Sequence, residues 1–231
     1  MKKEIRFTAM LLCMALGLGN VAQAQKAVSS AGGHDYVDLG LPSGTLWATC
    51  NVGASKPEDY GNYYAWGETK PQASNTYDWN TYKYANGAYD KLTKYCDKSD
   101  RGNNGFTDNL TILEPGDDAA TANWGSGWRT PTKEQWDELL ANTTHQWTTQ
   151  NGVEGRKFTS KKNGATLFLP AAGYPYKGKL KLAGRGGYGY YLSRSLFNPS
   201  ESWCLVVSDF DCSFDSWIRC FGRSVRPVRQ K

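Results

Sequence analysis

Residues 36–52, YVDLGLPSGTLWATCNV, hold two short apolar segments on either side of a turn. The first segment, residues 36–39, and the second, residues 45–49, are rich in aromatic, β-branched and leucine side chains that favour strands. The Pro-Ser-Gly sequence at 42–44 between them is typical of a turn. This stretch therefore predicts two strands joined by a tight connection near the start of the folded domain.

The clearest predicted helix begins after Thr130 and Pro131, which supply a cap and a first-turn proline. Trp136, Leu139 and Leu140 follow at helical spacing and form an apolar stripe that we expect to face the core. A shorter helix is predicted upstream, where two aspartates at 117–118 precede an alanine-containing segment, because carboxylates favour a helix N-terminus.

Strand and loop signals dominate the rest of the chain. The Asn-Gly pair at 163–164 lies between residues 157–161 and 165–169 and predicts a two-residue hairpin. Residues 187–229 alternate like short antiparallel strands, whereas residues 60–86 are aromatic and rich in loops. Helices and strands do not alternate, so the predicted class is α+β, with short antiparallel strands, about two helices and long irregular loops. Nine Trp and fourteen Tyr predict an aromatic core.

The first 24 residues have the order of a Sec signal peptide. A basic start precedes an apolar stretch over 7–21, and Ala-Gln-Ala at 22–24 is a small-x-small cleavage site. We expect a flexible lead over 25–34 and one domain over 35–231, exported to the periplasm, the cell surface or the medium, with no transmembrane segment in the mature chain. Loss of the signal peptide lowers the net charge from +5 to +3, which argues against nucleic acid as a partner.

Five of the six cysteines lie outside the signal peptide. An exported protein can form disulfides, and an odd number leaves at least one thiol unpaired. Cys50 and Cys96 lie in the framework-like half of the chain and form the expected disulfide. Cys204, Cys212 and Cys220 repeat at eight-residue spacing, which matches no metal-binding motif.

Four blocks of sequence together resemble the major paralogous domain family of the FISUMP type. They are residues 36–54, residues 60–68 (YGNYYAWGE), residues 124–132 (WGSGWRTPT) and residues 222–228 (GRSVRPV). The family is related to C-type-lectin-like and formylglycine-generating-enzyme-like domains. The resemblance implies a compact C-type-lectin-like domain whose first and last strands pair, with a long irregular region between them. It implies little about the ligand, because such folds host unrelated functions.

Catalysis is the minority interpretation. Formylglycine-generating enzymes share an Arg-x-Pro-Thr…Trp pattern, present here at residues 129–132 and Trp136, but their chemistry needs redox-active cysteines in a substrate groove. The three C-terminal cysteines do not stand in the sequence context of such a site. His34 and His145 have neither hydrolase nor zinc spacing. We therefore expect that the protein is not an enzyme.

A calcium loop is only faintly suggested by residues 97–108. Asp97, Ser99, Gly102 and Asp108 echo the spacing of such a loop, but Arg101 stands where an oxygen ligand belongs. The last position is Asp instead of a bidentate Glu, and a solvated turn explains the same residues. The sugar-binding calcium motifs Glu-Pro-Asn and Trp-Asn-Asp are absent from the sequence. No metal or other cofactor is expected.

The C-terminal segment, about 190–222, resembles the variable region of proteins diversified by a diversity-generating retroelement. Such elements substitute adenines, so an Asn codon cannot become Lys, Glu, Gln, Met or Trp, and none of twelve outward-facing positions breaks this rule. We predict that these twelve contact the ligand: Arg194, Phe197, Cys204, Val207, Asp209, Asp211, Cys212, Phe214, Ser216, Ile218, Cys220 and Phe221. The alternative is that the phenylalanines and Ile218 belong to the core and that the cysteines are buried thiols.

Two classes of function follow from the sequence. In the first, a secreted or surface-exposed domain presents residues 192–221 to a protein or carbohydrate ligand, with aromatic side chains supplying the affinity. In the second, the domain is a structural component of the cell envelope or of an appendage, and its aromatic residues belong to the core. A formylglycine-generating-type enzyme is a minor third possibility.

Overall fold

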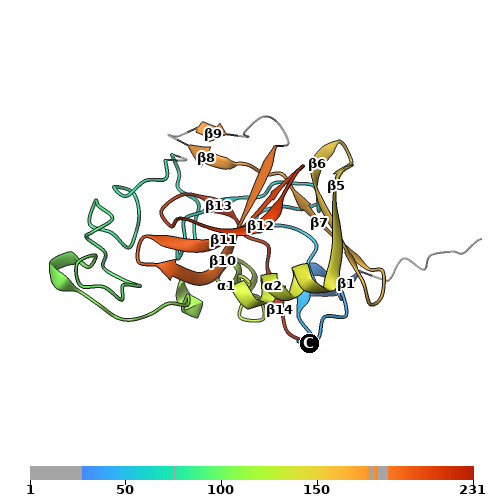
Figure 1. The fold of residues 1–231 in the computed structure, drawn as a ribbon, viewed down its shortest axis with the longest axis horizontal. Helices are drawn as coiled ribbons and strands as arrows, with labels where there is room; N and C mark the ends of the chain where they lie inside the picture. The colour runs from blue at the N-terminus through green and yellow to red at the C-terminus, as the bar shows by residue number, and fades with distance from the viewer. Residues whose placement is uncertain (1–27, 75, 177–178, 182–186) are drawn as a thin grey trace, which may run out of the picture.

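The computed structural model describes residues 28–74, 76–176, 179–181 and 187–231 (Figure 1). Antiparallel sheets dominate it, and two α-helices pack against them, so the predicted α+β class is confirmed. The signal peptide predicted over 1–24 lies outside the described residues. None of the helices in the described part of the chain is long and apolar enough to cross a membrane.

The two ends of the domain share one sheet. Its order is β1-β2-β3-β14, with β1 at Ser29–Ala31, β2 at His34–Val37, β3 at Leu46–Ala48 and β14 at Val228–Arg229. The two strands and the turn predicted from residues 36–52 are therefore confirmed. The interpretation of residues 25–34 as a flexible lead is wrong for 29–34, because β1 pairs with β2 in a hairpin.

A five-stranded sheet forms the centre of the molecule, in the order β12-β11-β10-β13-β4 (Figure 1). Its long strands are β10 (Tyr188–Asn198), β11 (Glu201–Ser208) and β12 (Cys212–Ile218), and they follow one another as an antiparallel meander. The short strands β13 (Arg223–Ser224) and β4 (Tyr63–Tyr64) complete it. Within this sheet β12 is an edge strand that pairs only with β11.

A three-stranded sheet lies at one end of the molecule. It consists of β5 (Thr143–Gln150), β6 (Val153–Ser160) and β7 (Thr166–Pro170). Next along the chain, β8 (Tyr174–Tyr176) and β9 (Lys179–Lys181) form a separate two-stranded sheet. The predicted hairpin at residues 163–164 is confirmed, but its loop is longer than two residues. Ser160 N donates to Ala165 O at 2.8 Å, which encloses four residues. Gly164 has a φ of +70°, the left-handed conformation that its lack of a Cβ permits.

Helix α2, Lys133–Asn142, begins two residues later than predicted. Thr132 caps it, and the Thr132 side chain and Gln135 exchange hydrogen bonds with each other's backbone in a capping box. Pro131 precedes this cap, so it is not part of the first turn. Trp136 and Leu139 are fully buried and Leu140 is partly buried, as the apolar stripe predicted.

Helix α1, Ala119–Trp124, follows the 3₁₀ turn Pro115–Asp117 and begins where the sequence predicted. Its cap is Asp118, which is completely buried. One Asp118 carboxylate oxygen accepts from the backbone of Ala120 at 2.9 Å and from the Thr130 hydroxyl at 2.8 Å, and both oxygens accept from Thr130 N. This carboxylate therefore fastens the start of α1 to the segment that leads into α2.

The aromatic core has two parts. One lies between α2, the terminal sheet and the central sheet, where the Trp47 and Trp136 rings are 4.5 Å apart. The other lies under the long irregular segment between β4 and α1, at the opposite end of the molecule from β5–β7 (Figure 1). This segment contains the 3₁₀ turn Asn103–Gly105. Of its tyrosines, Tyr82 donates to Trp66 O at 2.7 Å, whereas Tyr84 and Tyr95 donate to the Asp117 carboxylate. The prediction of long loops over an aromatic core is confirmed.

Candidate functional site

The structure divides the twelve predicted ligand-contacting residues into a buried and an exposed group. Cys204 and Val207 are 0% exposed and Cys220 is 1% exposed, so these three are wrong as ligand contacts. The other nine are exposed or partly exposed: Arg194, Phe197, Asp209, Asp211, Cys212, Phe214, Ser216, Ile218 and Phe221.

The error has a physical reason in the position of β11. The prediction treated every second residue as outward-facing, which holds for a strand with one face in solvent. However, β11 lies between β10 and β12, and it has buried residues on both faces, with Cys204 on one face and Leu205 and Val207 on the other. Val207 packs into the core beside Trp136, whereas Cys204, on the other face, lies close to the buried Arg223 guanidinium.

Strand β12 differs, because all seven of its residues are at least partly exposed. The turn that leads into it is also open to solvent: Asp209 and Asp211 are exposed, and Phe210 is 74% exposed. Phe214 packs partly against the core. The prediction of an accessible surface in the C-terminal segment therefore describes β12 and its flanking turn, whereas most of β11 is buried and only Glu201, Trp203 and Val206 are partly exposed.

An aromatic surface, defined here as Phe197, Trp203 and Phe214, has one residue on each of β10, β11 and β12. The Phe197 ring lies 4.7 Å from Trp203, and Trp203 lies 6.4 Å from Phe214, both edge to face. Phe197 is 49% exposed, while Trp203 and Phe214 are partly exposed. Lys133 Nζ of α2 lies 5.1 Å above Trp203 and 5.0 Å above Phe214 and adds a cation–π contact.

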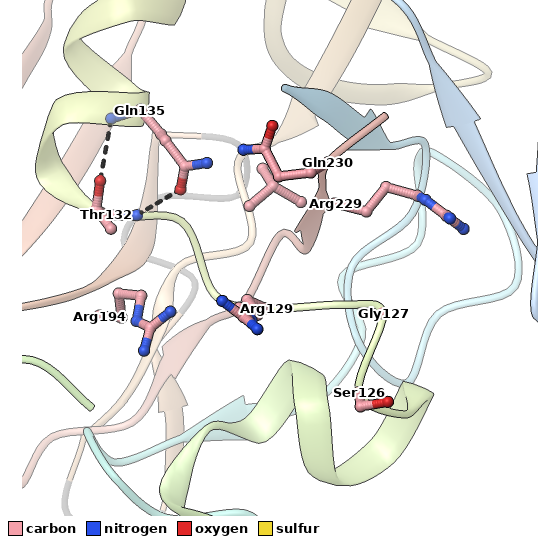
Figure 2. Close-up of a pocket in the computed structure, with 9 residues that line it drawn as sticks. Ser126, Gly127, Arg129, Thr132, Gln135, Arg194, Arg229 and Gln230 are labelled. Carbon is pink, nitrogen blue, oxygen red and sulfur yellow. Dashed lines mark hydrogen bonds between the residues drawn. The ribbon is translucent and has the colours of Figure 1, made fainter. Parts of the chain in front are cut away.

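A pocket of about 380 Å³ opens on the other side of the first turn of α2, and we call it the arginine pocket (Figure 2). Its wall is formed by the loop after α1, by the cap residue Thr132 and Gln135 of α2, by Arg194 of β10 and by β14 with Gln230. Figure 2 shows the Arg129 and Arg194 guanidiniums on the same side of the pocket below Thr132, whereas the Arg229 side chain points away from them. Arg194 is thus the only predicted ligand-contacting residue that lines this pocket.

The predicted disulfide between Cys50 and Cys96 is absent, because both residues are free thiols in the structure. Cys96 is buried, and its thiol donates to Lys98 O at 3.1 Å; the partly buried Cys50 lies beside the Thr49 hydroxyl. The prediction was based only on the location of both cysteines in the same half of the chain, whereas a disulfide also requires the two Cβ atoms to lie close together and face each other.

The remaining thiols are not arranged for nucleophilic chemistry. Burial raises the pKa of Cys204 and of Cys220 to about 12, and that of Cys212 to about 11. A thiol with such a pKa is almost entirely protonated at neutral pH, and the thiolate is the reactive form. These cysteines act as small apolar side chains.

The residues considered for metal binding or hydrolysis have structural contacts instead. Both Asp108 carboxylate oxygens accept backbone N–H groups, including Tyr95 N at 2.7 Å and Cys96 N at 2.9 Å. His34 stacks on Trp124 with ring centroids 3.8 Å apart, and His145 Nδ1 lies 3.0 Å from Arg156 Nη1. Across the described residues, no three His, Cys, Asp or Glu side chains are grouped so as to hold a metal ion.

Three buried arginines near the C-terminus escaped the sequence reasoning. Arg219 donates to Tyr95 O at 2.7 Å, Arg226 donates to Thr49 O at 2.6 Å, and Arg223 lies about 5 Å from the Tyr174 and Tyr190 rings. The sequence does carry a signal for them: arginines are frequent in residues 219–229, a stretch that also forms β13 and β14 and therefore lies inside the fold. These side chains fix the C-terminal segment to the loops.

No family model, curated protein or solved structure matches this chain.

Proposed function

We propose that the protein is an exported binding protein that presents the aromatic surface and the edge strand β12 to a protein or glycan ligand. The observation that carries the proposal is the cluster of Phe197, Trp203 and Phe214 on the three longest strands of the central sheet, in which Phe197 is exposed and the other two rings are partly exposed. Large aromatic side chains give much contact area at a low cost in conformational entropy, which is why they anchor many interfaces.

The scaffold around this surface suits recognition. β10 and β11 pair from Tyr188↔Ser208 to Asn198↔Glu201, with register shifts on both sides of Leu196, and β11 and β12 pair from Val207↔Cys212 to Glu201↔Ile218. A backbone held by two ladders loses little freedom on binding, so the contact energy of the side chains contributes more fully to affinity.

The fold we propose is C-type-lectin-like. Three features support this assignment: the chain ends share one sheet through β3 and β14, two helices flank the sheets, and a long irregular segment lies between β4 and α1. These features agree with what the resemblance to the FISUMP-type family implies.

We propose that diversification of the C-terminal segment is confined to its exposed positions. Side chains on a surface change at little cost in stability, usually within about 0.5 kcal/mol, whereas core changes cost several times more. The buried Cys204, Val207 and Cys220 therefore belong to the fixed scaffold. The gene sequence tests this proposal, because diversification requires a near-identical downstream repeat that differs at adenines, beside a reverse transcriptase. Differences at the codons of the buried positions would contradict it.

Binding without catalysis is the role we propose. Burial raises the pKa of Cys204, Cys212 and Cys220, so none of these thiols is poised to act as the redox-active cysteine of a formylglycine-generating enzyme. Incubation with a peptide that carries the sulfatase cysteine motif tests this directly. The proposal would be overturned if the wild-type protein converted the peptide cysteine and if a Cys204→Ser, Cys212→Ser or Cys220→Ser substitution abolished that conversion.

The binding role is tested by a glycan array and a displayed-peptide library. We expect the wild-type protein to retain a defined subset of ligands and the Phe197→Ser variant to lose at least tenfold in affinity for them. Phe106→Ser is the matched control, because Phe106 is 36% exposed on a loop outside the central sheet. Equal retention by both variants would contradict the proposed surface, and retention of no ligand would favour a structural component of the envelope or of an appendage.

A further inference from the structure

Three arginine side chains make the lining of the arginine pocket positively charged. Its wall includes Arg129, Arg194 and Arg229, and none of the three forms an ion pair with any Asp or Glu that the structure describes. Arg229 is held from the other side, where its guanidinium lies 5.5 Å from the Tyr36 and Trp128 rings. Arg129 and Arg194 are left to face the pocket together (Figure 2).

These two guanidiniums repel each other. Burial lowers the pKa of Arg194, and although the Asp118 carboxylate opposes this effect, the charge of Arg129 lowers the pKa further. Asp118 forms no ion pair with Arg194, because its oxygens accept the backbone and hydroxyl of Thr130 and the first N–H groups of α1. Two like charges at the edge of a pocket are stabilised by an anion that lies between them.

The backbone holds the pair in place. Arg129 N donates to Val228 O at 2.9 Å, and Val228 N donates back to Arg129 O at 2.8 Å. Arg194 N donates to Pro131 O at 2.8 Å, and one of its guanidinium nitrogens, Nη2, donates to Leu113 O at 2.5 Å. Because strands and helix ends fix both residues, the site needs little rearrangement to receive a ligand.

The guanidinium nitrogens that are not bonded within the protein determine which ligand group the pocket can bind. Arg194 Nε is buried beyond the reach of solvent and Nη2 is bonded to Leu113 O, so Nη1 is the Arg194 nitrogen left for a ligand, and the exposed Arg129 side chain has no hydrogen-bond partner among the described residues. The planar fork of a guanidinium matches two oxygens of a carboxylate, sulfate or phosphate. The volume of about 380 Å³ lies within the range of small-molecule sites.

We propose that the arginine pocket binds the oxyanion group of a small polar ligand, a carboxylate or a tetrahedral sulfate or phosphate, through Arg129 and Arg194. This site is separate from the aromatic surface, because Thr132 and Gln135 line the pocket, whereas Lys133 lies over Trp203 and Phe214. It adds a second binding site to the protein and does not depend on the function proposed above.

Isothermal titration tests the proposal with four matched probes: D-glucuronate, D-glucose 6-sulfate, D-glucose 6-phosphate and D-glucose. We expect at least one anionic probe to bind and D-glucose not to bind. Binding of D-glucuronate alone identifies a carboxylate site, and binding of the sulfate or phosphate alone identifies a tetrahedral oxyanion site. Raising the salt concentration should weaken the binding, because it screens partly exposed charges.

Arg129→Gln and Arg194→Gln should each weaken the binding at least tenfold, while Arg101→Gln, which removes the same charge outside the pocket, should leave it unchanged. Arg129 has no side-chain partner in the described chain, so Arg129→Gln tests the site even if Arg194→Gln unfolds. Phe197→Ser should bind the anion as the wild type does, which separates this proposal from the aromatic surface. The proposal is overturned if no anionic probe binds at millimolar concentration, if D-glucose binds equally well, or if Arg129→Gln leaves the affinity unchanged.

Discussion

Replacing Cys204 with Asn distinguishes a scaffold position from a binding position within the C-terminal segment. Cys204 is 0% exposed, in the middle of β11, with Leu192 of β10 and Asp215 of β12 as its neighbours across the two ladders. Asn has two more side-chain heavy atoms than Cys, so it crowds a closed site and adds a polar amide without an assigned partner. Overpacking costs about 1–3 kcal/mol and an unsatisfied buried polar group about 1–3 kcal/mol.

The expected loss of stability for Cys204→Asn is therefore about 3 kcal/mol. For a domain of this size, 1 kcal/mol corresponds to about 2–4 °C, so the melting temperature should fall by about 6–12 °C. Phe197→Asn removes a half-exposed ring and one edge-to-face contact, which is worth about 1 kcal/mol, and should lower the melting temperature by at most about 4 °C.

The assay is thermal unfolding followed by circular dichroism, with Cys204→Ala as the control. That variant removes only the sulfur and should cost about 1 kcal/mol, because one methylene-sized group is lost without a new polar atom. The reasoning is refuted if Cys204→Asn melts within about 2 °C of the wild type, or if Phe197→Asn destabilises the protein more than Cys204→Asn does.

Trp136→Ala should cost about 3–5 kcal/mol in unfolding free energy, since it empties a fully buried site beside Trp47, and an unchanged urea midpoint would argue against this burial. Burial alone would raise the pKa of Asp117, but hydrogen bonds from Lys94 and neighbouring side chains outweigh it and lower the pKa to about 2. The ionised carboxylate therefore stabilises the fold above about pH 4, and this stability should be lost as the pH falls toward 2. Asp117→Asn should reduce this acid dependence in urea titrations between pH 5 and pH 2, and an unaltered dependence would exclude the role. In a thiol titration of the native protein with Ellman's reagent, the partly buried Cys50 should react first, and the partly exposed Cys212 should react more slowly because burial raises its pKa to about 11. Rapid reaction of Cys96, Cys204 and Cys220 would contradict the burial of these three thiols.

Local signals predicted the elements well. The turn at residues 42–44, the apolar stripe from Trp136 to Leu140 and the Asn-Gly pair at 163–164 each depend on neighbours in sequence, and each of the predicted elements is present. The helix start was misplaced by two residues because Pro131 precedes the cap at Thr132, a detail decided by the reciprocal bonds with Gln135.

Predictions that depended on packing between distant segments succeeded less often. The alternation in β11 gave no sign that the strand is central with buried residues on both faces, so Cys204 and Val207 were assigned to the surface. The arginine pocket joins a loop, a helix start, β10 and β14, and the sequence alone does not indicate that these four segments meet. Whether Cys50 forms a disulfide likewise depends on tertiary geometry, which the sequence does not show.

The central claim is that the aromatic surface and β12 contact the ligand while the rest of the central sheet supports them. Hydrogen–deuterium exchange of the protein with and without a ligand retained on the array measures this directly. The account predicts slower exchange on binding in peptides that cover residues 209–218 and the end of β10 near Phe197, with no change around Phe106. Slower exchange confined to residues 97–108, or no change at 209–218 in a saturated complex, would contradict it.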